Sequence, residues 1–215
     1  MEFLIPGSDF AVCHDSSEDG GGSWFGQEYI PVIRSRYQRR FRRCLEWCAG
    51  PGFIGFGILD HGLCDELVLM DRNPQAQRSV AETCDRNGCH DRVEFYLCDR
   101  VAALPQHMMF DLVVANPPHY LECPGDDNYQ RLAVDPGWAA HEEFFQNIGS
   151  RLAADGVILL QENQAGSLAG AADFWHMIHG NGLAITAYWT SANHWDTDGP
   201  VQIYYIEIQH RQKKS

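Results

Sequence analysis

The segment Asn116-Pro117-Pro118-His119 has the residue types of a loop that holds a reactive nitrogen. It follows the apolar run 110–115, which predicts a buried strand. The Asn116 side-chain oxygen and the Pro117 carbonyl can each accept an N–H bond, and paired prolines stiffen the loop. Two fixed acceptors direct a planar nitrogen at an electrophile and stabilise the positive charge that develops on it. We therefore predict four catalytic residues, which are Asn116, Pro117, Pro118 and His119.

A Gly-Pro-Gly turn at residues 50–52 follows an earlier apolar run and, with Gly55, completes a GxGxxG pattern. Glycines let the backbone turn sharply and lie against a ligand in front of a helix N-terminus. The pattern alone is weak, because glycine turns also serve as plain connectors. Two acids raise its specificity, since Asp71 ends the next apolar run and Asp99 follows the third. Carboxylates at these strand ends can accept ribose hydroxyls and an adenine amino group, so we predict an adenosine-containing cofactor.

Glu46 precedes this turn and favours one cofactor over another. A dinucleotide such as NAD places a pyrophosphate near this position, which a carboxylate repels. S-adenosylmethionine (SAM) has no phosphate and carries an ammonium and a sulfonium, so an acid suits it. SAM is the favoured cofactor, and an NAD-dependent reductase is the remaining enzymatic alternative.

These motifs, in this order, resemble class I SAM-dependent N-methyltransferases with an Asn-Pro-Pro-Tyr-like motif, the glutamine and amino methyltransferase group. The resemblance covers roughly residues 25–165. Such enzymes methylate exocyclic amines of adenine or cytosine, a release-factor glutamine, or nitrogens of smaller molecules. The residues expected to bind the cofactor are Phe25, Gln27, Tyr29, Glu46, Cys48, Gly50, Gly52, Asp71, Arg72, Asp99 and Asn116.

The carboxyl ends of the fourth and fifth apolar runs carry the residues expected to bind the substrate. These are His119, Tyr120, Glu162 and Asn163. Nearby acidic positions are interpreted mostly as surface solvation or as acids that suit a helix dipole. They are Glu122, Asp126, Asp127, Asp135, Glu142 and Glu143, together with His141.

Two positions depart from the family pattern. Cys48 stands where the family commonly has glycine, which changes packing around the methionine end of SAM. His119 stands where enzymes acting on nucleic acids and release factors usually carry tyrosine or phenylalanine. A histidine can stack on a planar substrate or hydrogen-bond to it, and it titrates near neutral pH. Its presence weakens the inference to adenine.

Short apolar runs alternate with helical patterns along the chain and predict the frame that positions these residues. Strands are expected at 44–48, 66–70, 92–97, 110–115, 157–161, 183–189 and 202–209, and helices at 29–44, 53–59, 74–87, 139–152 and 168–179. The predicted fold is α/β, a Rossmann-like seven-stranded mostly parallel sheet with an antiparallel edge strand and helices on both faces. Residues 1–24 are polar and Gly/Ser-rich, which predicts a flexible N-terminal arm or lid, and residues 25–215 form the methyltransferase domain.

Composition limits the function classes. The chain has 215 residues, with 45% hydrophobic and 21% charged, as in a globular enzyme. No apolar run reaches about 18 residues and the N-terminus lacks a basic region, so neither a membrane span nor a secretory signal is expected. Eight cysteines without a CxxC pair indicate reduced thiols in a cytoplasmic protein. The histidines lack metal-ligand spacing, so no metal is expected, and a homodimer is left open.

The net charge of −13 disfavours a nucleic-acid substrate, although arginines cluster within residues 34–43. The leading hypothesis is therefore a SAM-dependent N-methyltransferase acting on an amide, guanidino or ring nitrogen of a small molecule, amino acid or peptide. RNA adenine-N6 or protein-glutamine methylation is the enzymatic alternative. A non-catalytic SAM-binding protein is the alternative of a different class.

Overall fold

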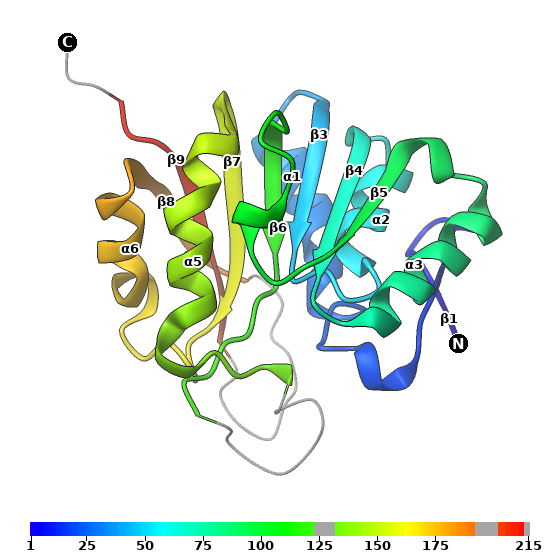
Figure 1. The fold of residues 1–215 in the computed structure, drawn as a ribbon, viewed down its shortest axis with the longest axis horizontal. Coiled ribbons are helices and arrows are strands. Elements are labelled where there is room, and N and C mark those ends of the chain that lie inside the picture. The colour runs from blue at the N-terminus through cyan, green and yellow to red at the C-terminus, as the bar shows by residue number, and fades with distance from the viewer. Residues whose placement is uncertain (123–131, 192–201, 213–215) are drawn as a thin grey trace. The chain divides into compact units, whose positions relative to one another are not determined.

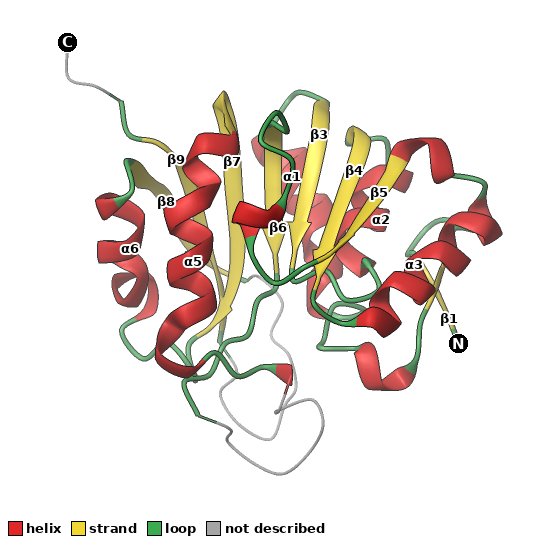
Figure 2. Cartoon of the chain, in the orientation of Figure 1, coloured by secondary structure: helices red, strands yellow, loops and turns green. Residues whose placement is uncertain are grey.

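The computed structural model describes residues 1–122, 132–191 and 202–212. In this part of the chain a 7-stranded sheet has the strand order β5-β4-β3-β6-β7-β9-β8 (Figure 1). Its strands are β3 (Phe41–Trp47), β4 (Cys64–Asp71), β5 (Val93–Leu97), β6 (Phe110–Ala115), β7 (Leu152–Asn163), β8 (Leu183–Thr190) and β9 (Ile203–His210). The helices around it are α1 (Tyr29–Arg36), α2 (Phe53–Asp60), α3 (Pro74–Asn87), α5 (Ala139–Ile148) and α6 (Trp175–Gly180) (Figure 2). The predicted Rossmann-like fold class is confirmed.

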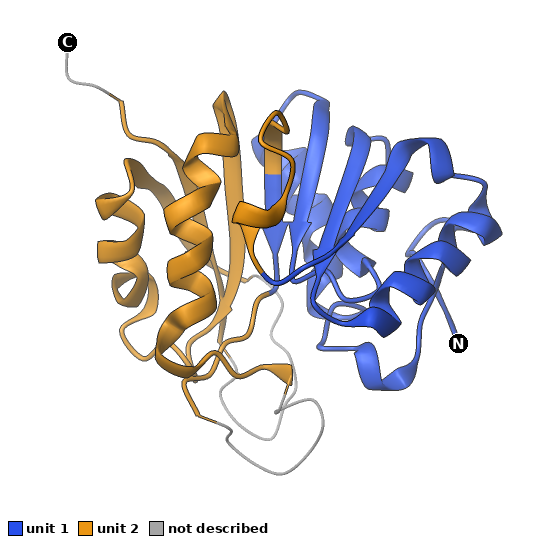
Figure 3. Ribbon diagram, viewed as in Figure 1, with its two compact units in different colours: residues 1–99, 113–116 blue, residues 100–112, 117–215 orange. Residues whose placement is uncertain are grey.

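The chain forms two compact units (Figure 3). Unit 1 contains residues 1–99 and 113–116, and unit 2 contains residues 100–112 and 117–215. The boundary passes between Asn116 and Pro117, which are joined covalently. Each unit therefore carries part of the predicted catalytic loop.

Unit 1 is built on the parallel strands β3, β4 and β5. Leu45 of β3 pairs with Val68 of β4, and both side chains are buried. Strands that are covered on both faces become continuous apolar runs, as in the Leu-Val-Leu-Met run 67–70. Helices α2 and α3 both contact β4. Because the strands are parallel, their carboxyl ends with Trp47, Asp71 and Leu97 lie at one edge of this unit.

Unit 2 is built on antiparallel pairing, in which β9 pairs with both β7 and β8. This is the antiparallel pair expected at one edge of the sheet. Helices α5 and α6 lie side by side (Figure 2). The buried rings of Phe144 and Phe145 on α5 belong to the core of this unit. The carboxyl end of β7, at Glu162 and Asn163, is fully or almost fully buried.

The N-terminal segment has regular structure where its composition predicted a flexible arm. Strands β1 (Glu2–Leu4) and β2 (Ala11–Cys13) pair antiparallel, and a short 3-10 helix covers Ser16–Glu18. The segment is fastened to α3, since the Cys13 N–H donates to the Thr83 hydroxyl at 2.9 Å. The Ser79 hydroxyl donates to Glu18 Oε2 at 2.7 Å. The polar residues that suggested flexibility are thus partners of a helix that is distant in sequence.

Several element boundaries differ from the expected ones. The helix expected at 29–44 ends at Arg36, and strand β3 begins at Phe41. Within β3, Arg43 Nε donates to Oε2 of Glu66 on β4 at 2.7 Å. Strand β7 begins at Leu152 rather than at residue 157, because the expected Ala-Asp-Gly turn is extended. The helix expected at 168–179 is a 3-10 turn at Gly170–Phe174 followed by α6. Within the described residues, no helix has the length and apolar character needed to cross a membrane.

Candidate functional site

The turn between β3 and α2 has a tightly constrained backbone. Gly50 and Gly52 have φ angles of 50° and 86°, in the left-handed region that favours glycine. A Cβ on Gly52 would also lie 2.9 Å from a methyl carbon of Leu69 and 2.9 Å from the Phe56 ring. Glycine at position 52 is therefore required both by backbone conformation and by packing. The turn places its backbone directly before the first residues of α2.

Cys48 shares this left-handed conformation, with a φ of 56°. A residue with a Cβ is strained there by roughly 1 kcal/mol, which explains why the resembling family commonly has glycine. We predict that Cys48→Gly leaves stability unchanged or raises it by up to about 1 kcal/mol. Urea unfolding of the two proteins measures this difference. A loss of more than about 1 kcal/mol would show that the half-buried thiol packs in a way that outweighs the strain.

Glu46 lies beneath the turn, with only 2% of its surface exposed. Its Oε2 accepts the Gly55 N–H at 2.7 Å, in the first turn of α2. Burial raises the pKa of the Glu46 carboxyl to about 8, against the lowering effect of the backbone N–H bonds from Gly55 and Ile54, while the Asp71 charge raises it further. In this structure Glu46 holds the start of the helix, which adds a structural role to the predicted contact with SAM.

Because the pKa of Glu46 is raised, ionisation of this buried carboxyl lowers the stability of the folded protein as pH rises. The variant Glu46→Gln removes this effect. An acid whose folded pKa exceeds its unfolded value destabilises the protein as pH rises from 4.5 to about 8. The glutamine oxygen can still accept the Gly55 N–H. We expect the variant to gain at most about 5 kcal/mol relative to the wild type across that interval. Unfolding free energies at pH 5 and pH 8 test this, and an identical difference at both pH values would contradict it.

Asp71 joins the ends of two neighbouring strands. Its Oδ2 accepts the Gly50 N–H at 2.7 Å, and its Oδ1 accepts the Asn73 N–H at 2.8 Å. The Asp71 carbonyl accepts the Cys98 N–H at 2.9 Å, which fixes the end of β5. The structure thus brings together the glycine turn and Asp71, as predicted from their order in the sequence. Asp99 follows Cys98 on this edge and is exposed.

The other residues predicted to bind SAM differ in exposure and in their hydrogen bonds. Arg72 is exposed and Phe25 is half-buried. The Gln27 amide donates to the carbonyls of Gly22 at 3.2 Å and Phe53 at 3.3 Å, which ties the N-terminal segment to α2. Tyr29 is fully buried, and its hydroxyl donates to the Ala115 carbonyl at 2.6 Å. Gln27 and Tyr29 therefore hold backbone segments in this structure, and Tyr29 holds the one that precedes Asn116.

Asn116 is oriented by the N-terminal segment. Its Nδ2 donates to the Gly20 carbonyl at 3.2 Å, and the side chain is half-buried. A primary amide has one donor group and one acceptor oxygen. Because the donor group is directed at Gly20, the Oδ1 atom lies on the opposite side of the amide. Unit 1 thus presents Asn116 as a hydrogen-bond acceptor, which is the chemistry that the catalytic prediction requires.

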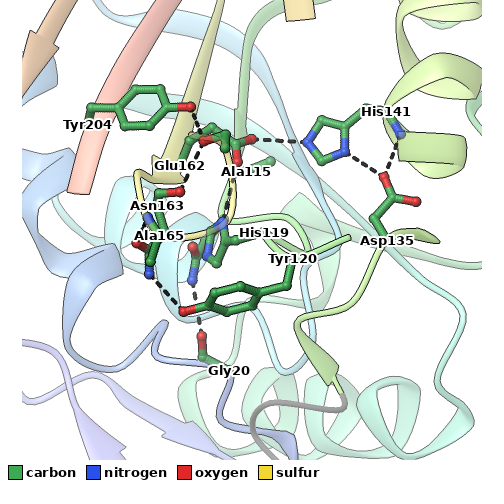
Figure 4. Close-up of polar contacts among 12 residues, drawn as sticks. Gly20, Ala115, His119, Tyr120, Asp135, His141, Glu162, Asn163, Ala165 and Tyr204 are labelled. Carbon is green, nitrogen blue, oxygen red and sulfur yellow. Dashed lines mark hydrogen bonds and ion pairs between the residues drawn. The ribbon is translucent and has the colours of Figure 1, made fainter. Parts of the chain in front are cut away.

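In unit 2, His119 belongs to a buried chain of ionisable groups (Figure 4). The His119 ring lies with Nδ1 3.4 Å from Oε2 of Glu162, a long hydrogen bond, and only 4% of the residue is exposed. The other Glu162 oxygen lies 3.0 Å from His141 Nε2, and His141 Nδ1 lies 2.7 Å from Asp135 Oδ2. Figure 4 shows the His141 ring between the two carboxyl groups. The interpretation of His141 and Asp135 as surface residues is wrong, because both are buried.

The charges of this chain follow from its geometry. Burial by itself would lower the pKa of His141, but the carboxylates of Glu162 and Asp135 raise it to about 9. Burial would raise the pKa of each carboxyl, but contacts with histidines and backbone N–H groups hold both values below their ordinary range. At neutral pH the group is therefore an imidazolium flanked by two carboxylates.

The loop that carries His119 packs on the segment after β7. A Cβ on Gly166 would collide with the His119 carbonyl, so only glycine fits there. The Asn163 amide donates to the Tyr120 hydroxyl at 3.1 Å. The predicted substrate residues His119, Tyr120, Glu162 and Asn163 thus lie together in unit 2. Their role in substrate binding stays a prediction.

A comparison with known protein families decides the class of this chain. The model of the methyltransferase small domain family matches residues 32–165. The chain belongs to this family. By family and by fold it is a class I SAM-dependent methyltransferase, a class in which SAM is the methyl donor.

Individual relatives of this methyltransferase match over part of its length. A tRNA1(Val) (adenine(37)-N6)-methyltransferase of Actinobacillus pleuropneumoniae serotype 5b (strain L20) is 27% identical over 123 residues, which is 56% of this chain and 51% of the relative. A ribosomal protein L11 methyltransferase of Janthinobacterium sp. (strain Marseille) is 32% identical over 88 residues, 35% of this chain and 28% of the relative. The chain thus spans about half the length of the first relative and less of the second.

Solved structures confirm the fold of the methyltransferase. The crystal structure of a ribosomal protein L11 methylase from Lactobacillus delbrueckii subsp. bulgaricus superposes with a TM-score of 0.59 at 14% identity, covering 86% of this chain and 78% of that chain. Identity at this level supports the fold alone.

Proposed function

We propose that this methyltransferase transfers a methyl group from SAM to a planar nitrogen, and that the nitrogen is the exocyclic amine of adenine in RNA. The observation that carries the proposal is the orientation of Asn116, whose donor group is bonded to Gly20. Its Oδ1 atom can then accept an N–H bond from the reacting nitrogen. Pro117 follows directly in the chain and supplies a second acceptor, its carbonyl.

The residues of the glycine turn and the neighbouring strand ends fit SAM. Gly50 and Gly52 keep the turn free of side chains, and the Asp71 carboxylate at the end of β4 is bonded to that turn. We assign the methionine end of SAM to the turn, the ribose to Asp71 and the adenine to the vicinity of Asp99. When bound, SAM supplies a methyl group made electrophilic by its sulfonium.

The catalytic task of this chain is to orient the nitrogen. An amine conjugated with an aromatic ring is a weak nucleophile because its lone pair is delocalised. Accepting both of its N–H bonds directs the lone pair and favours the positive charge that develops as the methyl group is transferred. The Tyr29 hydroxyl holds the Ala115 carbonyl and so fixes the backbone just before Asn116. The protein's part in this reaction is to position the nitrogen, because the electrophilic methyl group comes from SAM.

RNA is favoured as acceptor because one relative is a tRNA1(Val) (adenine(37)-N6)-methyltransferase. The arginines of residues 34–43 offer positive charge for a phosphate backbone, and Arg34 and Arg42 are exposed. Buried cysteine thiols such as that of Cys64 suit a reducing compartment, so we place the reaction in the cytoplasm. A small molecule or peptide with a planar nitrogen is the second candidate, because the net charge of −13 opposes a polyanion.

One labelling experiment separates these acceptors. The purified protein and SAM labelled in its methyl group are incubated with three separate pools, which are unmodified RNA, protein and small metabolites. We expect label in RNA, and not in RNA treated with nuclease before the reaction. Label confined to the metabolite pool would overturn the RNA proposal and support the second candidate. Absence of label in all three pools, together with no binding of SAM, would contradict the proposed activity itself.

A further inference from the structure

His119 differs from the tyrosine or phenylalanine of the resembling enzymes in one chemical respect. All three rings can stack on a planar base, but only the imidazole can accept a proton from it. In this chain the imidazole is also the end of the buried group formed with Glu162, His141 and Asp135. A ring that served only for stacking would not require such a group behind it.

We propose that Glu162, positioned by His141 and Asp135, holds His119 as the tautomer protonated on Nδ1, so that Nε2 accepts the proton released by the methylated nitrogen. The proposal rests on the proposed function, since it assigns a further catalytic residue to the same reaction. Glu162, His141 and Asp135 are positioning residues that act through His119.

The geometry fixes the tautomer. An imidazole that has a carboxylate at Nδ1 donates from that atom, which leaves Nε2 as the acceptor. Glu162 cannot move away from His119, because its other oxygen is held by His141 at 3.0 Å. His141 is in turn held by Asp135 at 2.7 Å and stacks on the Phe174 ring, with centroids 4.8 Å apart.

The buried group behind His119 carries a net negative charge. Asp135 and Glu162 carry two negative charges, and the His141 imidazolium carries one positive charge. One negative charge therefore remains in a buried region, and an imidazolium at His119 neutralises it. The ionisable groups that interact with Glu162 of β7 are His119, His141 of α5 and Tyr204 of β9. Asp135, before α5, interacts with His141, and the Tyr120 ring lies beside the His119 ring.

The proposed step balances as follows. The acceptor nitrogen forms a bond to the methyl carbon while the bond from that carbon to sulfur breaks, and the sulfur keeps the electron pair. The nitrogen gains a positive charge, and after transfer one of its two N–H bonds turns from the Pro117 carbonyl to His119 Nε2, which takes the proton. The His119 imidazolium later gives this proton to water. No oxidant, reductant or additional reactant is required.

The variant His119→Phe tests the proposal directly, because it keeps a ring for stacking and removes the proton acceptor. With unmodified tRNA transcript as probe, we expect kcat to fall at least about 100-fold, as for loss of a general base. The KM for RNA should change less than about threefold. His107→Phe, at an exposed histidine of the same unit, is the matched control and should keep wild-type kcat. If His119→Phe keeps kcat within threefold, the ring only stacks and the proposal is wrong.

Two further measurements do not depend on turnover by His119→Phe. Imidazole ¹⁵N chemical shifts of the wild-type protein should show His119 protonated on Nδ1 alone and His141 protonated on both nitrogens. Glu162→Gln replaces the carboxylate at His119 Nδ1 with an amide that can also donate, so the same spectra should show a larger share of the His119 tautomer protonated on Nε2. A wild-type His119 protonated on Nε2, or an unchanged tautomer in a folded Glu162→Gln protein, would overturn the proposal.

Failure of this inference is distinguishable from failure of the proposed function. If the wild type methylates RNA and His119→Phe does so equally well, only the role of His119 is lost. If the wild type binds SAM but methylates no nitrogen in RNA, the proposed acceptor is wrong, and the ¹⁵N measurement still decides the tautomer.

Discussion

Asn116→Ala should lower kcat for methyl transfer by about 100- to 1000-fold while the affinity for SAM changes little. Removal of one preorganised hydrogen-bonding group from a developing charge typically costs this much in rate. The cofactor is assigned to the glycine turn and Asp71, which are held together independently of Asn116 by the 2.7 Å bond from the Gly50 N–H. Single-turnover transfer of labelled methyl groups measures the rate, and the rise in melting temperature with SAM measures binding.

The conservative variant Asn116→Asp separates chemistry from folding. Aspartate keeps an acceptor oxygen but cannot donate to the Gly20 carbonyl as the amide does at 3.2 Å. We expect it to retain more activity than Asn116→Ala, since the resembling family uses either residue in this motif. Equal activity of Asn116→Ala and the wild type would remove Asn116 from the catalytic assignment.

His141→Gln should destabilise the protein by about 3–5 kcal/mol, the range for breaking a buried ion pair. The substitution leaves Asp135 and Glu162 as two buried carboxylates without their shared cation. The His141 ring is fully buried, between these carboxylates and beside the rings of Trp138 and Phe174. Equilibrium unfolding in urea at pH 6 measures the loss, with His107→Gln, at an exposed histidine, as control.

The difference in unfolding free energy between the wild type and His141→Gln should depend on pH. The pKa of His141 is raised from an ordinary 6.5 to about 9 in the folded state. A histidine with a raised folded pKa contributes stability that is complete below pH 6.5 and is lost as pH rises to about 9. The free-energy difference between the wild type and His141→Gln should therefore shrink by about 3 kcal/mol over that interval. A difference that stays constant from pH 6 to pH 9 would show that His141 is not an imidazolium in the folded protein.

The sequence predicted which site residues lie close together when those residues stand at the ends of parallel strands. In a parallel sheet the carboxyl ends of strands share one edge, so the positions of Gly50 and Asp71 after consecutive apolar runs were enough to bring them together. The same rule related Glu162 and Asn163, at the end of β7, to the substrate edge. Long apolar runs also gave the strands and the fold class.

Contacts between polar residues far apart in the chain could not be predicted, because they produce no recognisable pattern in the sequence. In the sequence, Asp135 and His141 look like exposed residues at the start of a helix. In the structure, Asp135 accepts the Ala140 N–H in the first turn of α5 at 2.9 Å and also binds the buried His141 ring. The Gly/Ser-rich composition before Trp24 predicted flexibility. In the structure, however, the Gly20 carbonyl accepts a hydrogen bond from the Asn116 side chain, which is 96 residues away in the sequence. Local composition cannot reveal partners of this kind.

Identification of the methylated atom tests the proposed acceptor nitrogen directly. Unmodified tRNA transcript is incubated with the purified protein and SAM, digested to nucleosides and analysed by mass spectrometry against standards for each methylated position. We expect N6-methyladenosine with the wild-type protein and at least about a 100-fold lower initial rate of its formation with Asn116→Ala. Methyl groups found on ribose oxygen or on base carbon, or equal rates with both proteins, would contradict this expectation.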